Sequence, residues 1–319
     1  MPGIPRRSLG RWIRAALLAI GIVLLFSAGW SLYIGWTLTH LPRAAMPTSP
    51  RLWGMPYRTV EFPSAVDRLK IRAWWIPVPH ATMTVVFSHG FGSNRADIGV
   101  PGLLMMRAVH LWGANVLTFD YRDEGRSPGR MITVGQDEVR DLVGAVTAAR
   151  IRLAPGLPVA VVGYSMGASV ALMAGEQDAQ VGAVVADSPF ASLTPYLEHN
   201  LPIWTGLPSF PFDWLLLHVA APLLGLQPAR VDPLAHVRSL GERPVLLIAG
   251  TKDNTIPHRN SQEIYRALRR TDPNAELWLV PGADHVESFQ LRPLQYLARL
   301  WRLLHDVDPG LRQVPHYGL

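Results

Sequence analysis

The sequence predicts an α/β fold, in which a mainly parallel, doubly wound sheet carries an apolar cap insertion and follows an N-terminal transmembrane helix. Three observations lead to this prediction. Short apolar strands alternate with helical segments from about residue 83 to residue 189 and again from residue 244, a pattern typical of a parallel sheet covered on both faces. Residues 190–238 interrupt that alternation, and a long apolar run begins at residue 15.

The apolar run predicts a membrane anchor over residues 15–38. No charged side chain occurs in residues 15–42, which as a helix would measure about 42 Å against a hydrocarbon core of about 30 Å. Trp30, Tyr33 and Trp36 lie near its far end, as in an interfacial aromatic belt. The alternatives are a buried core helix and a cleaved signal peptide, whose apolar region is roughly 7–15 residues long.

Charge around this run predicts its orientation. The basic segment 1–14 contains four arginines, and an excess of basic residues marks the cytoplasmic side of a membrane span. We therefore expect a single-pass protein with a cytoplasmic N-terminus and an α/β domain in the periplasm or outside the cell. Three arginines on the other flank, Arg43, Arg51 and Arg58, act against this orientation.

Composition narrows the functional classes. The net charge is +6, but four of those charges belong to the basic N-terminal segment, so the high pI does not indicate a nucleic-acid partner. The chain has no cysteine, and its 11 histidines are scattered. We therefore expect no disulfide, no metal site and no cofactor. The sequence does not indicate an oligomeric state.

A proline-rich linker, residues 39–58, precedes the predicted α/β domain, residues 59–305, and a tail follows over residues 306–319. The domain begins with two predicted edge strands, Thr59–Phe62 and Leu69–Ile76. Further strands are expected at 83–88, 115–120, 159–162, 181–186, 245–249 and 276–280, and helices at about 102–112, 139–149, 258–269 and 287–304.

The central strand leads directly into the sequence Gly163-Tyr164-Ser165-Met166-Gly167, and a helical segment follows. This is the G-x-S-x-G pattern in its strand–turn–helix context, where a sharp turn exposes the serine hydroxyl. Glycines at both ends allow the strand and helix to pass closely. Ser165 is therefore the predicted nucleophile, and a helix N-cap is the structural alternative.

Residues 190–238 are predicted to form a cap over the site. The segment contains many prolines and aromatic residues, and residues 213–225 are apolar almost all round, as in a helix buried on both sides. An ordinary crossover with a long loop is the alternative, although crossovers rarely need so many residues.

A serine nucleophile needs a base and a group that orients the base. In this architecture both are expected after the serine, acid first and histidine second, in loops that follow later strands. Asp253 and His285 meet that expectation. Asp187, which also ends a strand, is the rival acid. His89 lies within a glycine-rich loop and is expected to be structural.

The tetrahedral intermediate also needs two hydrogen-bond donors for its oxyanion. We expect the backbone N–H of Met166 at the start of the serine's helix. The second predicted donor is the backbone N–H of Phe91, because the glycines on either side allow the loop to turn an amide inward.

Five motifs together resemble the α/β-hydrolase fold superfamily, and more narrowly the membrane-anchored serine hydrolases of the ABHD and S33 peptidase-like type. They are His89-Gly90-Phe91-Gly92, Phe119-Asp120-Tyr121-Arg122 with Gly125-Arg126-Ser127, the serine turn, Gly250-Thr251-Lys252-Asp253, and Asp284-His285. The resemblance covers about residues 59–305 and implies the roles assigned above. Such turns usually have glycine after the arginine, where this chain has Asp123, and we expect aspartate to tolerate the left-handed backbone.

These features predict a serine hydrolase that cleaves a carboxylic ester of a small-molecule or lipid-like acyl substrate. The cap carries few acids, namely Glu198, Asp213 and Asp232, so a substrate with a free amino group is disfavoured. A peptidase or amidase of the same fold is the alternative. An inactive, membrane-tethered binding protein is a further one.

Overall fold

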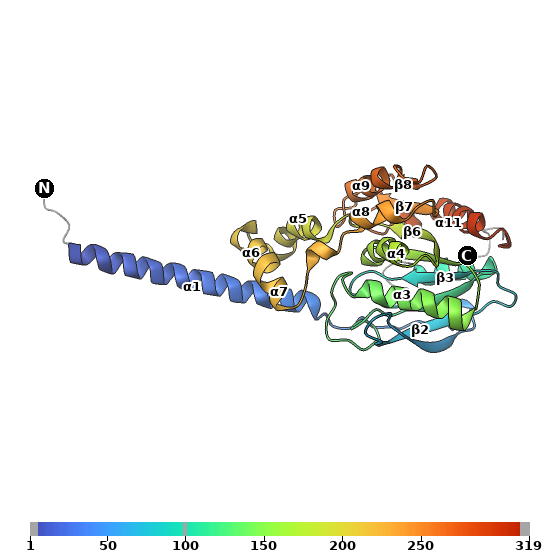
Figure 1. Ribbon diagram of the computed structural model, residues 1–319, viewed down its shortest axis with the longest axis horizontal. Helices are drawn as coiled ribbons and strands as arrows, with labels where there is room; N and C mark the ends of the chain where they lie inside the picture. Colours follow the sequence, from blue (N-terminus) through green and yellow to red (C-terminus); the bar gives the residue numbers. More distant parts are fainter. Residues whose placement is uncertain (1–5, 98–100, 313–319) are drawn as a thin grey trace. The chain divides into compact units, whose positions relative to one another are not determined.

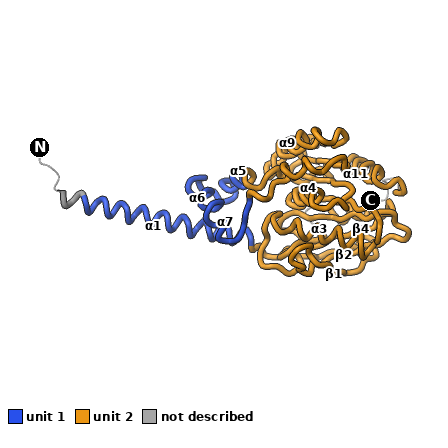
Figure 2. Tube along the Cα trace, viewed as in Figure 1, with its two compact units in different colours: residues 1–39, 197–228 blue, residues 40–196, 229–319 orange. Residues whose placement is uncertain are grey.

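The computed structural model describes residues 6–97 and 101–312, with side chains from residue 10 onward. Contacts divide the chain into two compact units (Figure 2). Unit 1 combines residues 1–39 with residues 197–228, and unit 2 combines residues 40–196 with residues 229–319.

Unit 2 is built on an eight-stranded sheet of order β1-β2-β4-β3-β5-β6-β7-β8 (Figure 1). β2 pairs antiparallel with β1 and with β4, and all other pairings are parallel. The prediction of a mainly parallel α/β sheet is therefore confirmed. The strands are β1 (Arg58–Pro63), β2 (Lys70–Ile76), β3 (Thr84–Ser88), β4 (Asn115–Phe119), β5 (Val159–Tyr164), β6 (Val181–Asp187), β7 (Val245–Gly250) and β8 (Glu276–Val280).

One strand prediction was wrong in its placement. The second predicted edge strand, β2, lies inside the sheet between β1 and β4. Its last residues, Trp74, Trp75 and Ile76, are all buried. An interior strand needs such a continuous apolar run because neighbouring elements cover both of its faces.

Successive side chains of a strand point to opposite faces of the sheet. The central strands are buried throughout, so helices cover both faces. Apolar residues of α2 and α11 pack against one face of the central strands, whereas α3 and α4 contact each other and α4 contacts β5 and β6. The helices of unit 2 are α2 (Gly102–Leu111), α3 (Glu138–Ala148), α4 (Met166–Gln177), α8 (Pro233–His236), α9 (Arg259–Leu268), α10 (Ser288–Leu291) and α11 (Pro293–Val307), with short turns η1 (Pro50–Trp53), η2 (Ala149–Leu153) and η5 (Val237–Ser239).

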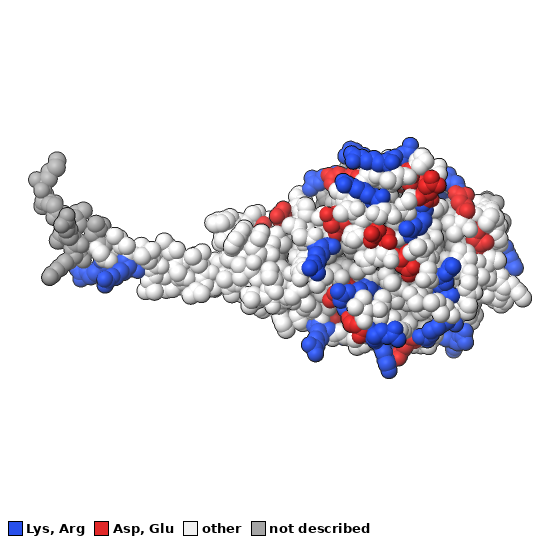
Figure 3. All heavy atoms as spheres, viewed as in Figure 1, with Lys and Arg blue, Asp and Glu red and all other residues white. Residues whose placement is uncertain are grey.

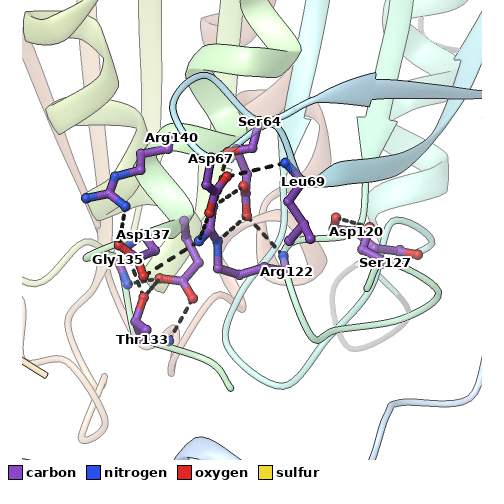
Figure 4. Close-up of polar contacts among 12 residues, drawn as sticks. Ser64, Asp67, Leu69, Asp120, Arg122, Ser127, Thr133, Gly135, Asp137 and Arg140 are labelled. Atoms are coloured by element: carbon purple, nitrogen blue, oxygen red, sulfur yellow. Dashed lines mark hydrogen bonds and ion pairs between the residues drawn. The ribbon is translucent and has the colours of Figure 1, made fainter. Parts of the chain in front are cut away.

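Arg122 fixes the loop that follows β4 (Figure 4). Its buried guanidinium donates from Nη2 to Asp141 Oδ1 at 2.7 Å and from Nη1 to Asp67 Oδ2 at 2.9 Å. A further hydrogen bond of 3.1 Å runs to Ser64 Oγ. One side chain thereby joins the β1–β2 turn, the loop after β4 and helix α3.

The turn after Arg122 keeps the left-handed backbone that was expected of it. Asp123 has φ = 58°, and Gly125 has φ = 49°. A side chain on Gly125 would collide with the buried Asp120 carboxylate. The departure from glycine at position 123 therefore leaves the turn intact, because aspartate adopts this conformation more readily than most residues.

The segment predicted as a linker packs on unit 2. The Arg43 guanidinium lies 3.0 Å from Asp123 Oδ1, and the Asn94 side-chain amide donates to the carbonyl oxygens of Ala44 and Ala45. Met55 is buried in the apolar core. The segment is thus held by specific contacts as well as by the stiffness of its prolines.

Unit 1 contains the long helix α1 (Arg6–Thr39), most of α5 (Leu193–Thr205), α6 (Ser209–Leu215), the π-helical turn η3 (Leu216–Ala220) and α7 (Ala221–Leu223). Among the described helices, α1 is the one that by itself is long and apolar enough to span a membrane, over Gly10–Thr39. The single helix expected over residues 213–225 is instead three consecutive pieces. The pattern of apolar residues does not predict the π-helical turn η3 within it.

The region predicted as a cap is divided between the two units. Residues 197–228 belong to unit 1, whereas residues 190–196 and 229–238 belong to unit 2. In unit 2 these flanking segments are joined by backbone hydrogen bonds from Leu193 N to Val231 O and from Leu234 N to Ala191 O, both 2.9 Å. The insertion therefore leaves unit 2 and returns to it at adjacent points.

Candidate active site

Ser165 lies on a strained turn between β5 and α4. Its backbone has φ = 54° and ψ = −120°, a region that costs a non-glycine residue of order 1–3 kcal/mol. A Cβ atom on Gly163 would lie closer than 3.0 Å to the backbone of Gly167, and one on Gly167 would collide with the backbone of Ser88. The two glycines of the motif are therefore required by backbone approach.

Three predicted side chains come together at this turn. His285 Nε2 lies 3.0 Å from Ser165 Oγ, and His285 Nδ1 lies 2.8 Å from Asp253 Oδ2. Because a carboxylate only accepts hydrogen bonds, Nδ1 carries the ring proton and Nε2 faces the serine as an acceptor. This is the protonation arrangement that a general base needs.

The loop after β7 fixes the Asp253 carboxylate. Its Oδ1 accepts from the backbone N–H of Thr255 at 2.9 Å and of Ile256 at 2.7 Å, which leaves Oδ2 for the imidazole. The Asp253 side chain is fully buried, whereas that of His285 is 21% exposed. The Asp253 carboxylate is thus held rigidly, and the His285 imidazole remains accessible to solvent.

The rival acid, Asp187, is placed differently. Its Oδ1 accepts a hydrogen bond of 3.1 Å from Ser188 Oγ, and its backbone oxygen accepts from Ser165 N–H at 2.8 Å. Among the described contacts, His285 Nδ1 donates to Asp253 Oδ2 rather than to Asp187. Asp187 therefore supports the turn through its backbone, and burial raises the pKa of its carboxyl to about 7.

This carboxyl predicts a pH-dependent stability. Between about pH 4 and pH 7, the unfolded chain releases the Asp187 proton while the folded chain keeps it, so the free energy of unfolding falls as pH rises and levels off above about pH 7. The contribution is on the order of 4 kcal/mol at ~1.4 kcal/mol per pKa unit. Urea unfolding of the full chain in detergent should show a shallower pH slope in Asp187→Asn.

Part of the slope should remain in that variant, because burial also raises the pKa of Asp97 to about 7. An unchanged slope in Asp187→Asn would contradict the assignment.

The predicted oxyanion donors, Met166 and Phe91, lie in the two chain segments next to Ser165. Met166 is the first residue of α4, so its N–H has no partner within the helix and lies at the positive end of the helix dipole. The loop after β3 passes beside the serine, since a Cβ on Gly90 would lie 3.4 Å from Ser165 Cβ. Phe91 follows Gly90 in that loop and is partly exposed.

Sequence reasoning missed Glu124, which holds this loop. Its Oε1 accepts from Gly92 N–H at 2.5 Å, one residue beyond the expected donor Phe91. Burial, with a contribution from the nearby Glu138, raises the pKa of Glu124 well above its usual value. The signal available in the sequence was an acid inside a glycine-containing turn after a strand, which does not specify a partner.

His89 has the structural surroundings that were expected. Its Nε2 accepts from the backbone N–H of Tyr121 at 3.1 Å, and its Nδ1 lies 2.8 Å from the carbonyl oxygen of Gly90. Burial lowers the pKa of its imidazole. Both ring nitrogens are therefore occupied by backbone groups in a neutral ring.

Known proteins share this architecture. The model of the alpha/beta hydrolase family matches residues 85–300. Protein YqkD of Bacillus subtilis (strain 168), described as uncharacterized, is 30% identical over 240 residues, which cover 72% of this chain and 74% of that protein. Human protein ABHD12B is 26% identical over 215 residues, which cover 63% of this chain and 55% of that protein.

A solved structure agrees with these sequence matches. The esterase Pf2001 of Pyrococcus furiosus superposes with a TM-score of 0.72 and 28% sequence identity, covering 85% of this chain and 98% of that chain. The sheet order and the strained serine turn agree with the family match. This chain therefore belongs to the alpha/beta hydrolase family.

Proposed function

We propose that this hydrolase is a serine esterase that works through an acyl-enzyme on Ser165. The observation that carries the proposal is the hydrogen-bonded series from Asp253 Oδ2 through His285 to Ser165 Oγ, with distances of 2.8 Å and 3.0 Å. The strained turn that presents the serine supports it, because strain of this kind is concentrated at functional sites.

In the proposed reaction, Ser165 Oγ attacks the carbonyl carbon of an ester while its proton passes to His285 Nε2. The carbonyl oxygen becomes an oxyanion and accepts hydrogen bonds from the N–H groups of Phe91 and Met166. His285 then gives its proton to the leaving alkoxide, and the acyl group stays on Ser165. Water then attacks the acyl carbonyl carbon and gives a proton to His285 Nε2. His285 passes this proton to Ser165 Oγ as the carboxylic acid is released.

An apolar acyl ester is the proposed substrate class. Residues 197–228 contain no lysine or arginine, and their only acids are Glu198 and Asp213, so the inserted segment is predominantly apolar. The likeness to the Pyrococcus furiosus esterase supports an ester over an amide. A panel of nitrophenyl esters and aminoacyl amides would reveal an amidase if the amides were hydrolysed faster.

Replacing the nucleophile provides the main test. We expect a fluorophosphonate probe to label the full-length wild type and to leave Ser165→Ala unlabelled, because the probe reacts only with an activated serine. Hydrolysis by Ser165→Ala should fall by roughly 10⁶-fold, the scale seen when a serine nucleophile is removed. The matched control is Ser239→Ala, an exposed serine of η5, which should label like the wild type. Labelling of Ser165→Ala would overturn the proposal.

We further propose that α1 is an uncleaved anchor with its N-terminus in the cytoplasm. The helix continues without interruption to Thr39, beyond the length of a signal peptide's apolar region, and Arg11 and Arg14 precede its apolar part. A membrane-impermeant form of the same probe should then label Ser165 in cells that have lost their outer membrane or wall but keep an intact cytoplasmic membrane. Labelling only after lysis would reverse the orientation.

A further inference from the structure

Unit 1 exposes apolar side chains beyond those of α1. In the segment 197–228, Phe210 is 81% exposed, Leu223 71% and Ile203 65%. Figure 3 shows the charges on α1 confined to its N-terminal end, and residues 197–228 add only two acids. Clusters of exposed apolar side chains in a sparsely charged surface mark a site of interaction with an apolar partner.

This segment packs against one face of α1. Ser27, Ser31 and Gly35 are buried, although the side chains around them are largely exposed, and they recur every four residues on one face of the helix. Ser31 Oγ donates to the carbonyl oxygen of Phe212 at 3.4 Å. Small residues at this spacing allow helices to approach closely within membranes.

A cluster of leucines extends this contact toward the C-terminal end of α1. Leu201, Leu216 and Leu217 are buried together and pack with Ile34 and Leu38 of α1. A Cβ atom added at Gly35 would lie 3.1 Å from Leu224 Cδ1. The contact therefore runs along the last third of the helix and involves α5, α6, η3 and the residues after α7.

The position of the contact along α1 sets its depth. Arg14 is the last charged residue before the apolar run, and a hydrocarbon core of about 30 Å accommodates about 20 helical residues, which corresponds to residues 15–34. Ser31 then lies about 5 Å inside the far boundary of the core. Phe212, which is bonded to it, must lie at a similar depth.

We propose that residues 197–228 are embedded beside α1 in the lipid leaflet at the C-terminal end of that helix. The occupant of their exposed apolar face is then the acyl chains of phospholipids. Insertion about 5–10 Å deep is typical of interfacial helices, and Trp214, 52% exposed, is a residue type enriched at this level of a membrane. Because the segment has no lysine or arginine, we expect its insertion to be independent of anionic lipids.

The insertion has a consequence for the reaction, which rests on the proposed esterase activity. The segment leaves unit 2 after β6 and returns before β7, so the chain between these two strands enters one lipid leaflet. Because the enzyme is then held at the bilayer, esters dissolved in the bilayer are its expected substrates.

The absence of cysteine makes a depth measurement direct. Phe210→Cys and Trp214→Cys, each labelled with an environment-sensitive fluorophore, would be compared in full-length protein in phosphatidylcholine vesicles. Val66→Cys, a 66% exposed apolar position in the β1–β2 turn of unit 2, is the matched control. We expect iodide quenching at positions 210 and 214 to be at least fivefold weaker than at position 66, and quenching by nitroxide-bearing lipid to be strong only at 210 and 214.

Equal iodide access at all three positions would overturn the inference. Protection from iodide without quenching by the lipid nitroxide would also overturn it, since a protein surface would then cover the face. Adding anionic lipid or salt should leave the result unchanged, and a shift of more than twofold would contradict purely apolar insertion. Repeating the measurement in Ser165→Ala separates this inference from the proposed activity, because depth does not depend on a working nucleophile.

Discussion

Asp253→Asn is expected to lower kcat by about four orders of magnitude, the loss that follows when the acid of such a triad is replaced by its amide. The Asp253 carboxylate accepts from His285 Nδ1 at 2.8 Å, which keeps Nε2 free to receive the serine proton. An asparagine can donate from its amide to Nδ1, and the imidazole then carries its proton on the side of Ser165. The base would be present but unable to accept.

The fold should survive this substitution. The backbone N–H groups of Thr255 and Ile256 bond to Oδ1 of Asp253, and an asparagine oxygen can still accept both. Steady-state kinetics should therefore show the loss in kcat with little change in KM, because the interaction contributes to the transition state rather than to substrate binding.

Asp187→Asn is the control, since this acid also ends a strand and is nearly fully buried. Its carboxyl is bonded to Ser188 rather than to the imidazole, so kcat should stay within about tenfold of the wild type. If Asp187→Asn lost as much kcat as Asp253→Asn, the assignment of Asp253 as the residue that orients His285 would be contradicted.

The choice between Asp253 and Asp187 shows how far the sequence predicts the site. Ser165, Asp253 and His285 each follow an apolar strand, and the carboxyl ends of parallel strands meet at one edge of a sheet. Their approach could therefore be predicted from local patterns. Which of two strand-ending acids reaches the imidazole depends on the side-chain geometry of each loop, and the sequence left Asp187 as a rival for that reason.

Unit 1 shows where the sequence is not informative. The proline-rich segment was predictable as an interruption of the α/β pattern, but its packing on α1 joins residues about 180 positions apart, such as Ser31 and Phe212. No local propensity encodes such a contact. The four-residue spacing of Ser27, Ser31 and Gly35 is the sole trace of it in the sequence, and small residues also occur in apolar helices without a partner.

Arg122→Met is expected to lower the free energy of unfolding by about 3–5 kcal/mol, the usual cost of removing one partner from a buried ion pair. The cost arises at Asp141, which is fully buried and pairs with the guanidinium at 2.7 Å. Asp67 contributes less because its side chain is 41% exposed and water can replace the arginine. Urea unfolding of the full chain in detergent, followed by tryptophan fluorescence, measures the change.

Two further variants identify the cause of that loss. Arg140→Met removes a partly exposed pair with Asp137 and should cost less than about 1 kcal/mol. The double variant Arg122→Met/Asp141→Asn removes the buried charge together with its partner and keeps an oxygen that accepts from the backbone N–H of residue 122, so it should recover more than half of the stability. If the double variant were as unstable as Arg122→Met alone, the guanidinium would act by joining the β1–β2 turn to the loop after β4, through Ser64 and Asp67, rather than by neutralising Asp141.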